Sequence, residues 1–584
     1  MQYAEIIIKS RTSFNNQIFT YEIPPQMLSE IKIGCLVEIP FGNRIVEGII
    51  WNLKKHSNIK SLKKIKRIIT PFPIINDLQK SLAIWMSKYY LEPLGKCLFT
   101  ILPPIPKRLA AKIPSIKNPP SIKKSKKYFF SGSREERFEV YKKIILKHPS
   151  GKILIIFPDI DYLNKFKKII QPYNLKVICQ EKEISSHKRF DEWFKVLTQN
   201  PNLILGTRSA IFNPIFDLKW IIIDEPSHFS HKQEQSPRYH VLKIAQRISE
   251  LSGSGLITAD NLPPLELYLA LKEKKYFRIK NPTPQAPGPK IKIIDLRGEK
   301  TLISFSLENE IRTALAKNKS ILIYATRRGS GTSAICKDCG NVKLCPRCNL
   351  PLIPYTQTKK LVCHQCHHQQ RENLICEKCG GTNIRYSGIG IEKIKELCEK
   401  LFGKNKNITI ETKRILSEEK KYDLVAIISI DALLNLPDPL ILEEIFQTLS
   451  RLKSAAKESL IIQSYFVDNP IFQSLNHPNQ FLEKELQKRF REKLPPYYRL
   501  IKIISQNKSE EDAVAKIKKL DAEIQDSRLE IMGPTKSFIY QKRDNFYYQL
   551  IIKVPFNFNY FEYLSNLKSF NANFKIDVDP LTLL

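Results

Sequence analysis

Short runs in which apolar and polar residues alternate dominate the first seventy residues of the chain. Alternation with a period of two is typical of a β-strand with one buried and one exposed face. A proline pair and a Pro-Phe-Gly-Asn sequence interrupt the runs, which span residues 3–8, 19–23, 35–39 and 46–51. The pattern predicts a small β-barrel or sandwich. Apolar residues at helical spacing follow, and they predict one helix over residues 77–90.

From residue 128 the pattern changes to continuous apolar runs separated by helical stretches. Runs at residues 151–157, 203–205 and 220–223 are each followed by a polar turn. Continuous apolar strands that alternate with helices are typical of a parallel sheet covered on both faces. A second set starts near residue 290 and continues to about residue 470. The sequence therefore predicts two successive α/β units, followed by an α+β segment that ends in a strand at residues 574–578.

The length and composition bear on domain count and compartment. A chain of 584 residues is too long for one core, so we expect three to five domains. Residues 103–127 hold six prolines and eight lysines or arginines, and we interpret them as a linker. No apolar run reaches the length of a membrane span, and the first residues do not resemble a signal peptide. These features predict a cytoplasmic protein that binds no membrane.

The net charge points to a polyanionic partner. Lysine and arginine together exceed aspartate and glutamate by 36, and the excess is spread along the chain. Binding to phosphates would release counterions from a nucleic acid, so a nucleic acid is the partner that this charge predicts. The alternative is compositional drift, because the chain is rich in Ile, Lys and Asn, as an AT-rich genome would produce.

The cysteines provide the most specific chemical signal. Eight of the twelve fall within 44 residues as four Cys-x-x-Cys pairs. Two such pairs complete a four-thiolate zinc site, so four pairs predict two zinc ions per chain. A disulfide framework is the alternative, but it is typical of small secreted domains. Because no open ligand position is implied, we expect these zinc ions to organise structure and not to catalyse.

Motifs in and around the α/β units carry a resemblance to a known family. The strand at residues 220–223 ends in Asp-Glu-Pro-Ser-His, which places a carboxylate pair at the end of a sheet strand. The other motifs are Gly-Thr-Arg-Ser-Ala-Ile-Phe at 206–212, Thr-Arg-Arg-Gly at 326–329, Gly-Ile-Gly-Ile-Glu at 388–392, Leu-Pro-Pro-Tyr at 494–497 and Asp-Val-Asp-Pro at 577–580. With the four cysteine pairs, these motifs resemble the PriA family of bacterial primosomal replication-restart helicases.

The resemblance implies a multidomain α/β organisation. It implies an N-terminal β-rich domain that binds 3′ DNA ends, two RecA-like lobes of superfamily 2 type, a two-zinc insertion in the second lobe, and a C-terminal α+β domain. The linker leaves no room for the family's winged-helix domain. The expected ranges are 1–102 for the 3′-DNA-end-binding domain, 103–127 for the linker, 128–285 for lobe 1, 286–335 with 381–475 for lobe 2, 336–380 for the zinc-binding module and 476–584 for the C-terminal domain.

The resemblance also orders the zinc ligands. Spacing alone permits either sequential or nested pairing of the cysteine pairs, whereas the family arrangement implies nesting. In the nested arrangement the outer pairs hold the first zinc ion and the inner pairs hold the second. The first set is Cys336, Cys339, Cys376 and Cys379, and the second set is Cys345, Cys348, Cys363 and Cys366.

Candidate DNA-binding residues follow from the same comparison of motifs. Near the N-terminus the candidates are Phe19, Thr20 and Gly34, close to positions that cap a 3′ end in the family. Thr20 replaces the family's Asp, and an ordinary surface-strand threonine is the alternative. The candidates in lobe 1 are Arg208, Lys232 and Arg238. The alternative role of Arg208 is an ion pair within the lobe.

The nucleotide site departs from the family pattern. A phosphate-binding loop needs glycine-rich backbone, a lysine on the phosphates and a serine or threonine on magnesium. In the corresponding segment, Arg137 stands at the lysine position and Phe138 at the threonine position. Glu135 and Glu136 stand where the triphosphate would lie, and like charges repel strongly in a desolvated site. ATP is therefore a doubtful cofactor.

Other motor elements are altered as well. Asp224 and Glu225 remain as a degenerate Walker B pair, and no catalytic residue is assigned. The coupling loop of the family, Ser-Ala-Thr, reads Thr-Ala-Asp at 258–260, and motif V is missing between residues 411 and 423. Ala455 and Glu458 replace both arginines of the family's finger motif. An arginine finger contributes roughly 10³–10⁵ in rate where it acts.

These observations lead to one hypothesis and two alternatives. The hypothesis is a replication restart protein that recognises stalled or abandoned forks and promotes primosome assembly and reloading of the replicative helicase, without ATPase or helicase activity. The alternatives are an active ATP-dependent 3′→5′ DNA helicase with a divergent site, and a zinc-ribbon protein that binds RNA or acts in transcription. The expected partners are forked and single-stranded DNA with 3′ ends, primosome and helicase-loading proteins, and single-stranded DNA-binding protein. The resemblance implies a monomer.

Overall fold

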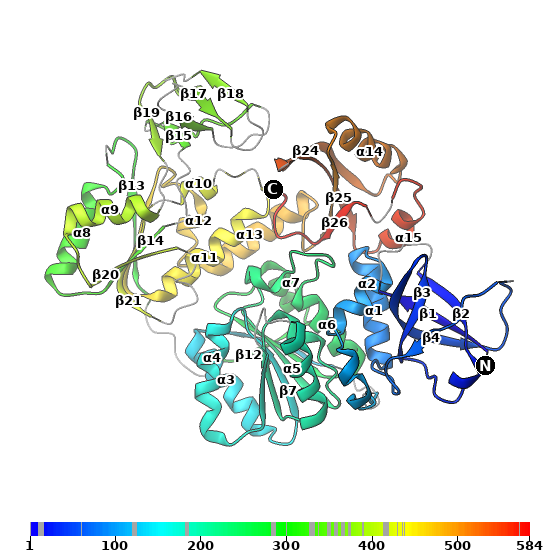
Figure 1. Cartoon of the computed structure of the whole chain (residues 1–584). Coiled ribbons are helices and arrows are strands. Elements are labelled where there is room, and N and C mark those ends of the chain that lie inside the picture. The colour runs from blue at the N-terminus through cyan, green and yellow to red at the C-terminus, as the bar shows by residue number, and fades with distance from the viewer. Residues whose placement is uncertain are drawn as a thin grey trace.

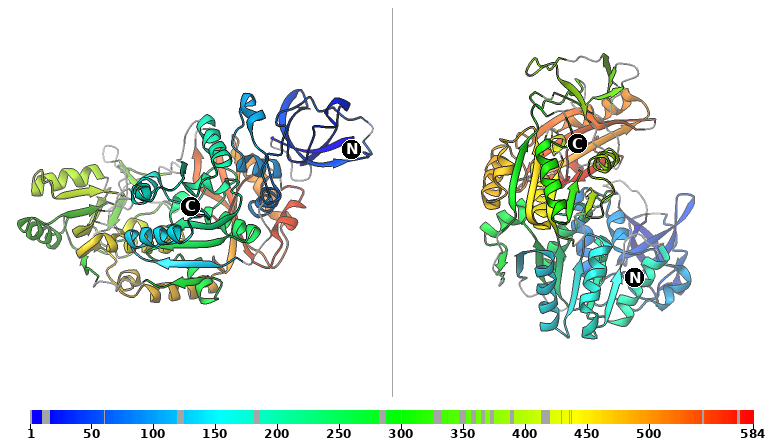
Figure 2. Two further views of the ribbon diagram at one scale, coloured as in Figure 1. Left: turned by 90° about the horizontal axis from the view of Figure 1, so that it is seen from below. Right: turned by 90° about the vertical axis from the view of Figure 1, so that its left-hand side faces the viewer.

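The structure, a computed structural model, describes most of the chain as six sheets with their helices (Figure 1). The N-terminal sheet lies at one end of the molecule and the second α/β unit at the other, with the first α/β unit and the C-terminal sheet between them (Figures 1 and 2). The described residues are 2–9, 17–59, 61–118, 125–180, 186–281, 288–299, 301–325, 333–336, 338–346, 352–355, 360–363, 368–371, 375–387, 391–412, 420–428, 430–434, 436, 438–542, 544–570 and 573–584.

The N-terminal unit is the antiparallel β-structure that the alternation predicts. Its sheet has the order β2-β1-β4-β3-β5, and apolar residues of alternate positions form its core. A capping box between Asn76 and Gln79 starts α1 at the expected residue. The elements are β1 (Tyr3–Ile8), β2 (Ile18–Glu22), β3 (Leu36–Phe41), β4 (Arg44–Lys54), β5 (Arg67–Ile68), α1 (Asp77–Tyr90) and α2 (Leu94–Ile101).

The first α/β unit, which we call lobe 1, contains a seven-stranded parallel sheet of order β12-β6-β11-β10-β7-β9-β8. Helices α3 and α4 pack on one face, and α5 and α6 pack on the other. The predicted parallel sheet is confirmed. The elements are β6 (Lys127–Ser131), α3 (Arg134–Lys147), β7 (Lys152–Ile156), α4 (Ile160–Ile170), β8 (Val177–Gln180), α5 (Ser186–Gln199), β9 (Leu203–Gly206), β10 (Leu218–Asp224), α6 (Val241–Ser252), β11 (Gly255–Asp260), α7 (Leu265–Lys272) and β12 (Phe277–Ile279).

The second α/β unit, lobe 2, contains a five-stranded parallel sheet of order β13-β22-β21-β14-β20. Helices α8 and α9 cover one face, and α11 and α13 cover the other. The elements are β13 (Lys290–Asp295), α8 (Phe305–Ala316), β14 (Ile321–Tyr324), α9 (Ile391–Phe402), β20 (Ile408–Glu411), β21 (Tyr422–Ile427), α10 (Asp431–Leu434), α11 (Ile441–Ala455), β22 (Ala456–Ser464), α12 (Pro470–Gln473) and α13 (Pro478–Arg491).

Two smaller units complete the molecule. The cysteine-rich segment forms a small β-structure that stands out from lobe 2 (Figure 1). Its strands are β15 (Ser333–Cys336), β16 (Ile353–Tyr355), β17 (Lys360–Val362), β18 (Gln369–Arg371) and β19 (Ile384–Ser387). The C-terminal unit is an antiparallel sheet of order β24-β25-β23-β26 with two helices. Its elements are β23 (Tyr498–Asn507), α14 (Glu510–Glu523), β24 (Glu530–Lys542), β25 (Asn545–Pro555), α15 (Tyr560–Ser565) and β26 (Lys575–Val578).

The segment interpreted as a linker is packed over its described part. Ala110, Ile113 and Ile116 are buried, and they belong to the same apolar cluster as residues of lobe 1. A 3₁₀ turn at Lys107–Lys112 begins this packing. Residues 103–118 therefore fix the N-terminal unit to lobe 1 instead of tethering it loosely. None of the described helices is both long and apolar enough to span a membrane.

Candidate functional site

Three buried carboxylates gather where two neighbouring strands of lobe 1 end. Asp224 is the last residue of β10 and Asp260 the last residue of β11, and the parallel register pairs Asp224 with Ala259. Glu225 follows with φ of 47°, a left-handed conformation that few non-glycine residues adopt. All three residues are 3% exposed or less. Buried carboxylates at one place are costly unless cations join them.

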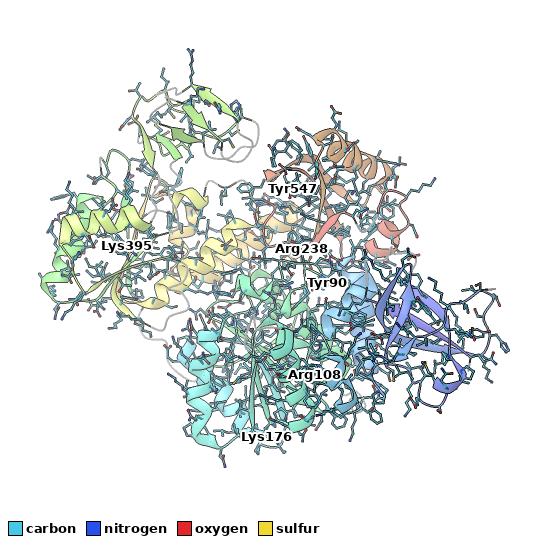
Figure 3. All side chains as sticks on the ribbon, viewed as in Figure 1. Tyr90, Arg108, Lys176, Arg238, Lys395 and Tyr547 are labelled. Carbon is cyan, nitrogen blue, oxygen red and sulfur yellow. The ribbon has the colours of Figure 1, made fainter. Side chains whose placement is uncertain are left out.

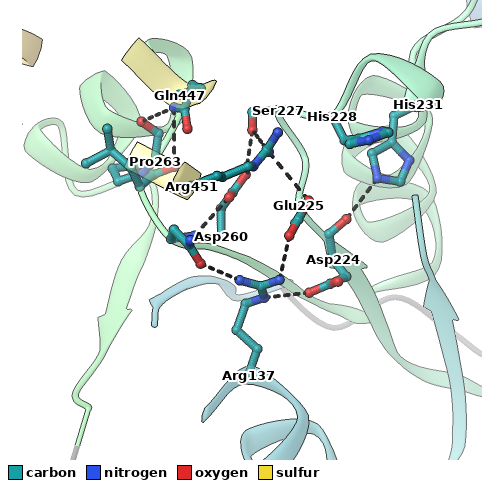
Figure 4. A network of polar contacts seen from close by, with 12 residues as sticks. Arg137, Asp224, Glu225, Ser227, His228, His231, Asp260, Pro263, Gln447 and Arg451 are labelled. Carbon is teal, nitrogen blue, oxygen red and sulfur yellow. Dashed lines mark hydrogen bonds and ion pairs between the residues drawn. The ribbon is translucent and has the colours of Figure 1, made fainter. Parts of the chain in front are cut away.

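Arg137 supplies the first cation, from the first turns of α3. Its Nε donates to Asp224 Oδ1 and its Nη2 donates to Glu225 Oε1, each at 2.8 Å (Figure 4). Its Nη1 donates to the carbonyl of Gly132 at 3.1 Å and to Asn261 Oδ1 at 2.7 Å. Every guanidinium nitrogen thus has a partner within the protein. The residue at the lysine position of the family motif faces the Walker-B-like carboxylates.

Two tyrosines complete the environment of the acidic pair. Tyr141 donates its hydroxyl to Asp224 Oδ1 at 2.7 Å, and Tyr162 donates its hydroxyl to Glu225 Oε1 at 2.9 Å. Burial raises the pKa of both tyrosines, so both remain donors at neutral pH. Burial alone would raise the pKa of Glu225, but Arg451 and Arg137 outweigh it and lower that pKa to about 2. Glu225 is therefore held as a carboxylate.

Arg451 supplies the second cation, and it comes from lobe 2. It lies on α11, and its Nη2 donates to Ser227 Oγ at 2.7 Å. The same nitrogen lies 3.6 Å from Glu225 Oε2 and 3.6 Å from Asp260 Oδ2 (Figure 4). Ser227 in turn donates its hydroxyl to Asp260 Oδ2 at 2.6 Å. One arginine of lobe 2 therefore joins the carboxylate cluster of lobe 1.

The amino end of α3, where a phosphate-binding loop would present free N–H groups, is capped by the chain itself. Ser133 is the N-cap, and its backbone N–H donates to Glu136 Oε2 at 2.7 Å. Asn281 donates its side-chain amide to Glu136 Oε1 at 2.8 Å. A carboxylate thus occupies the end of the helix dipole that favours an anion.

The space left between the lobes at this place is small. The cavity bordered by Arg137, Glu225 and Arg451 has a volume of about 70 Å³, whereas small-molecule sites typically measure roughly 300–1,000 Å³. Magnesium would need the carboxylates that the two arginines neutralise. In this arrangement the side chains present do not fit ATP with magnesium.

His231 is buried beside the acidic pair and contacts the backbone of Asp224. Its Nε2 donates to the carbonyl of Asp224 at 2.8 Å, which defines a neutral tautomer protonated at Nε2. The ring is 0% exposed. Burial lowers the pKa of His231 to about 4, so the ring is neutral at physiological pH.

The predicted DNA contacts of lobe 1 take part in contacts within the protein. Arg208 donates through Nη1 to the carbonyls of Ser230 at 2.7 Å and Lys232 at 3.1 Å. Lys232 is buried, and its Nζ donates to the carbonyl of Val578 at 2.7 Å. Arg238 donates to the carbonyl of Ile576 at 2.8 Å, where lobe 1 meets the C-terminal sheet (Figure 3). The role of these three cations in DNA binding stays a prediction.

The N-terminal candidates lie on the sheet of the N-terminal unit. Phe19 and Thr20 are neighbours on β2, at one edge of the sheet, and Phe19 stacks edge-on against Phe41 at 5.0 Å. Gly34 lies just before β3 with φ of 93°, a conformation that favours glycine. A side chain at Gly34 would also meet Pro73 Cβ at 3.0 Å. Their contact with a 3′ end stays a prediction.

A cleft of about 920 Å³ lies between lobe 1, lobe 2 and the C-terminal unit. Three phenylalanines that line it are more than half exposed, namely Phe229, Phe277 and Phe556. Lysines of lobe 1, such as Lys243, and two arginines of lobe 2, Arg451 and Arg489, also border it. Exposed aromatic rings beside cations are the features on which single-stranded nucleic acids stack.

The outer cysteine pairs come together in a metal-binding arrangement. One sulfur from each of Cys336, Cys339, Cys376 and Cys379 lies within 4.8 Å of all the others. The Sγ atoms of Cys336 and Cys379 are 3.6 Å apart, and those of Cys339 and Cys376 are 3.7 Å apart. A tetrahedron of sulfurs about 2.3 Å from zinc has edges of about 3.8 Å, so these four residues fit zinc. The grouping is the nested one.

The inner pairs are described only in part. Cys345 and Cys363 are buried in the same small unit, while Cys348 and Cys366 lie outside the described residues. The second zinc site therefore stays a prediction. Among the predicted motifs, Thr-Arg-Arg-Gly at 326–329 also lies outside the described residues.

Arg451 and Asn261 are site residues that the sequence did not predict. Arg451 stands where the family's finger motif begins with glutamine, ahead of the two lost arginine positions at Ala455 and Glu458. Asn261 follows the altered coupling loop, and its contact with Arg137 depends on the tertiary fold. Charge balance could have indicated a second arginine at the site, because the buried carboxylates of Asp224, Glu225 and Asp260 require more than one cation.

Comparisons with known proteins show which family the chain resembles. The fold and site define a two-lobed parallel α/β protein with a β-rich N-terminal unit, a cysteine-rich module and a C-terminal antiparallel unit. Residues 5–103 match the PriA 3'DNA-binding domain (3'BD), and residues 492–581 match the Primosomal protein N C-terminal domain. The chain belongs to the PriA family of replication restart proteins, and its N-terminal domain is of the 3′-DNA-binding type.

Curated relatives named replication restart protein PriA support this assignment. The Bacillus subtilis protein is 26% identical over 72% of this chain and 58% of its own length. The Rickettsia prowazekii protein is 26% identical over 95% of this chain and 96% of its own length. The Synechocystis relative is covered over 59% of its length, so the chain spans less than two thirds of some relatives that it matches.

Solved structures superpose poorly on the chain. RecG bound to a three-way DNA junction is 11% identical, covers 70% of this chain and 53% of its own, and has a TM-score of 0.35. Mycobacterium smegmatis helicase Lhr bound to single-stranded DNA and AMP-PNP is also 11% identical, covers 62% of this chain and 46% of its own, and has a TM-score of 0.31. These scores support no inference about function.

Proposed function

We propose that this chain recognises stalled or abandoned replication forks and promotes primosome assembly and reloading of the replicative helicase, without turning over ATP. The observation that carries the proposal is the pairing of Arg137 with Asp224 and Glu225 at 2.8 Å. A protein that hydrolyses ATP needs that acidic pair for magnesium and attacking water. Here the pair is neutralised by the chain itself.

Fork binding is supported by the domain composition and by charge. The N-terminal 3′-DNA-binding domain supplies recognition of an exposed 3′ end. A net charge of +36 supplies attraction to phosphates. The aromatic cleft beside Phe229 offers a place for the single strand at a fork. Primosome and helicase-loading proteins and single-stranded DNA-binding protein are the protein partners that this role requires.

The zinc module fits this role as a rigid platform. Its four clustered thiolates, Cys336, Cys339, Cys376 and Cys379, would hold zinc and so fix the fold of a segment with little apolar core. Lys343 of the module is buried and lies 3.3 Å from Glu377, an ion pair that links the two ends of the segment. We infer a structural role for the metal in presenting a surface to DNA or partner proteins.

The test measures ATP hydrolysis and fork binding in the same samples of purified, zinc-loaded protein. Fluorescence anisotropy with a forked duplex that has a 3′-hydroxyl leading end should show binding. Hydrolysis should not exceed that of the Asp224→Asn/Glu225→Gln variant, with or without the fork. Fork-stimulated hydrolysis that this variant loses would instead establish the helicase alternative.

Further measurements test whether the protein recognises the 3′ end of the fork and whether it prefers DNA to RNA. A fork whose 3′ end carries a phosphate should bind more weakly, because a 3′-end pocket would exclude the added group. The Phe19→Ala variant should lose that discrimination while it keeps non-specific binding. Tighter binding to single-stranded RNA than to the fork would contradict the proposal and favour the RNA-binding alternative.

A further inference from the structure

The helix that carries Arg451 also makes the neighbouring contacts between the lobes. The side-chain amide of Gln447 lies 3.4 Å from the carbonyl of Leu262 and 3.3 Å from that of Pro263 (Figure 4). Glu443 accepts the backbone N–H of Leu265 at 2.8 Å. One face of α11 thus follows the turn between β11 and α7 of lobe 1. This turn comes directly after the altered coupling loop.

Apolar packing continues the same contact. Leu262, Leu265 and Tyr268 of lobe 1 belong to the buried apolar cluster formed by α11 and α13 of lobe 2. Leu265 is 1% exposed. Tyr268 also donates its hydroxyl to Glu483 on α13 at 2.8 Å. Burial of apolar surface favours association without any ligand.

The electrostatics favour the same arrangement. Arg137 binds one side of the acidic pair from within lobe 1, and Arg451 approaches Glu225 and Asp260 from lobe 2. If the lobes separated, the carboxylate of Asp260 would lose its only cation among the described ion pairs. Only the closed arrangement gives Asp260 this cation, and the attraction is strengthened there because both groups are shielded from water.

We propose that Arg451, supported by the α11 contacts, acts as a built-in cation that locks the two lobes in one closed arrangement, so that their relative position does not respond to ATP. The lock turns two lobes that a nucleotide would move into one rigid platform. This inference rests on the proposed absence of ATP turnover. It goes further, because a protein that fails to hydrolyse ATP can still open and close its lobes.

Single-molecule energy transfer between the lobes tests the lock in the full-length protein. Dyes introduced through unnatural amino acids at Lys176 in lobe 1 and Lys395 in lobe 2 occupy exposed positions on well-separated surfaces (Figure 3). We expect one energy-transfer peak that is unchanged by ATP with magnesium. In Arg451→Gln, molecules with lower energy transfer should form a second peak, and their population should be roughly tenfold or more larger than in the native protein.

A matched variant controls for loss of charge. Lys457 lies two residues beyond α11 and pairs with Asp423 inside lobe 2 at 3.1 Å. Lys457→Gln should therefore keep the single peak. Should Arg451→Gln fail to fold, Arg451→Met/Asp260→Asn removes the cation and one carboxylate together, and it should fold with open lobes.

The outcomes separate the lock from the proposed function. A native peak that moves on addition of ATP with magnesium overturns the lock, whether or not ATP is hydrolysed. A folded Arg451 variant whose peak matches the native one also overturns it. Hydrolysis measured in the same tube with a stationary peak would contradict the absence of turnover and leave the lock in place.

Discussion

At residue 137 an arginine makes contacts that a lysine could not make. A lysine offers one compact ammonium on a flexible stem, which suits a phosphate. The planar guanidinium of Arg137 instead spans two carboxylates at once, with Nε on Asp224 and Nη2 on Glu225. The same planar group also reaches Asn261. Arg137 is thereby a neutralising partner for both carboxylates of the acidic pair.

Removing this cation should destabilise lobe 1. Arg137→Met leaves Asp224 and Glu225 buried with one partner fewer, and breaking a buried ion pair costs about 3–5 kcal/mol. We expect a lower urea midpoint, followed by tryptophan fluorescence, and faster hydrogen exchange in β10. Lys142→Met on the same helix breaks only an exposed pair with Glu139 and should leave the midpoint unchanged. Equal midpoints for both variants would contradict this account.

The buried neutral ring of His231 should make stability depend on pH. Its pKa is about 4 in the folded protein and about 6.5 in the unfolded chain, so the unfolded chain binds a proton more readily between these values. Stability from this group is complete above pH 6.5 and is lost as the pH falls towards 4, by about 3 kcal/mol in total.

Urea midpoints measured from pH 7.5 to pH 4.5 check this expectation. The native protein should lose stability across this range more steeply than His231→Gln, whose side chain keeps a donor near the carbonyl of Asp224. His148→Gln, which replaces a histidine that is not fully buried, is the matched comparison. Parallel slopes for the native protein and His231→Gln would refute a role for this ring.

At the scale of elements, the segment of residues 232–240 connects units instead of reaching outward. Lys232 and Arg238 both donate to backbone carbonyls at β26, so the segment pairs lobe 1 with the C-terminal sheet. Lys232 also lies 2.8 Å from Asp577. Cations that the sequence assigned to DNA thus stabilise an internal boundary. The hydrogen bonds to the carbonyls of Val578 and Ile576 are with backbone atoms, so the side-chain sequence of β26 gives no sign of them.

The cysteine module allows an element-scale prediction about metal content. Cys339→Ser removes one of four clustered thiolates, so the protein should lose one equivalent of zinc by mass spectrometry under native conditions. Cys398→Ala, on α9 outside the cluster, should keep the full zinc content. Fork binding by the N-terminal unit should persist in both variants. Unchanged zinc in Cys339→Ser would exclude this residue as a ligand.

At the scale of the whole molecule, the periodicity of apolar residues predicted the separate units but did not predict the contacts between them. Local patterns predicted α1 at residues 77–90 and a parallel sheet that includes β7, β9 and β10, because strands and capped helices depend on nearby residues. The grouping of the outer cysteines also agrees with the sequence expectation. The contact between Arg451 and Asp260 joins positions far apart in the chain, and it exists only because the lobes close.

The apolar cluster shared by the lobes has a consequence for biosynthesis. Lobe 1 can pair all its strands once β12 has been made, yet Leu262, Leu265 and Tyr268 pack against helices that begin at Ile441 and end at Arg491. At ordinary rates of translation these helices emerge roughly ten to forty seconds later. During that interval the nascent chain carries an uncovered apolar strip beside the ribosome exit, which is a natural docking point for a holdase chaperone.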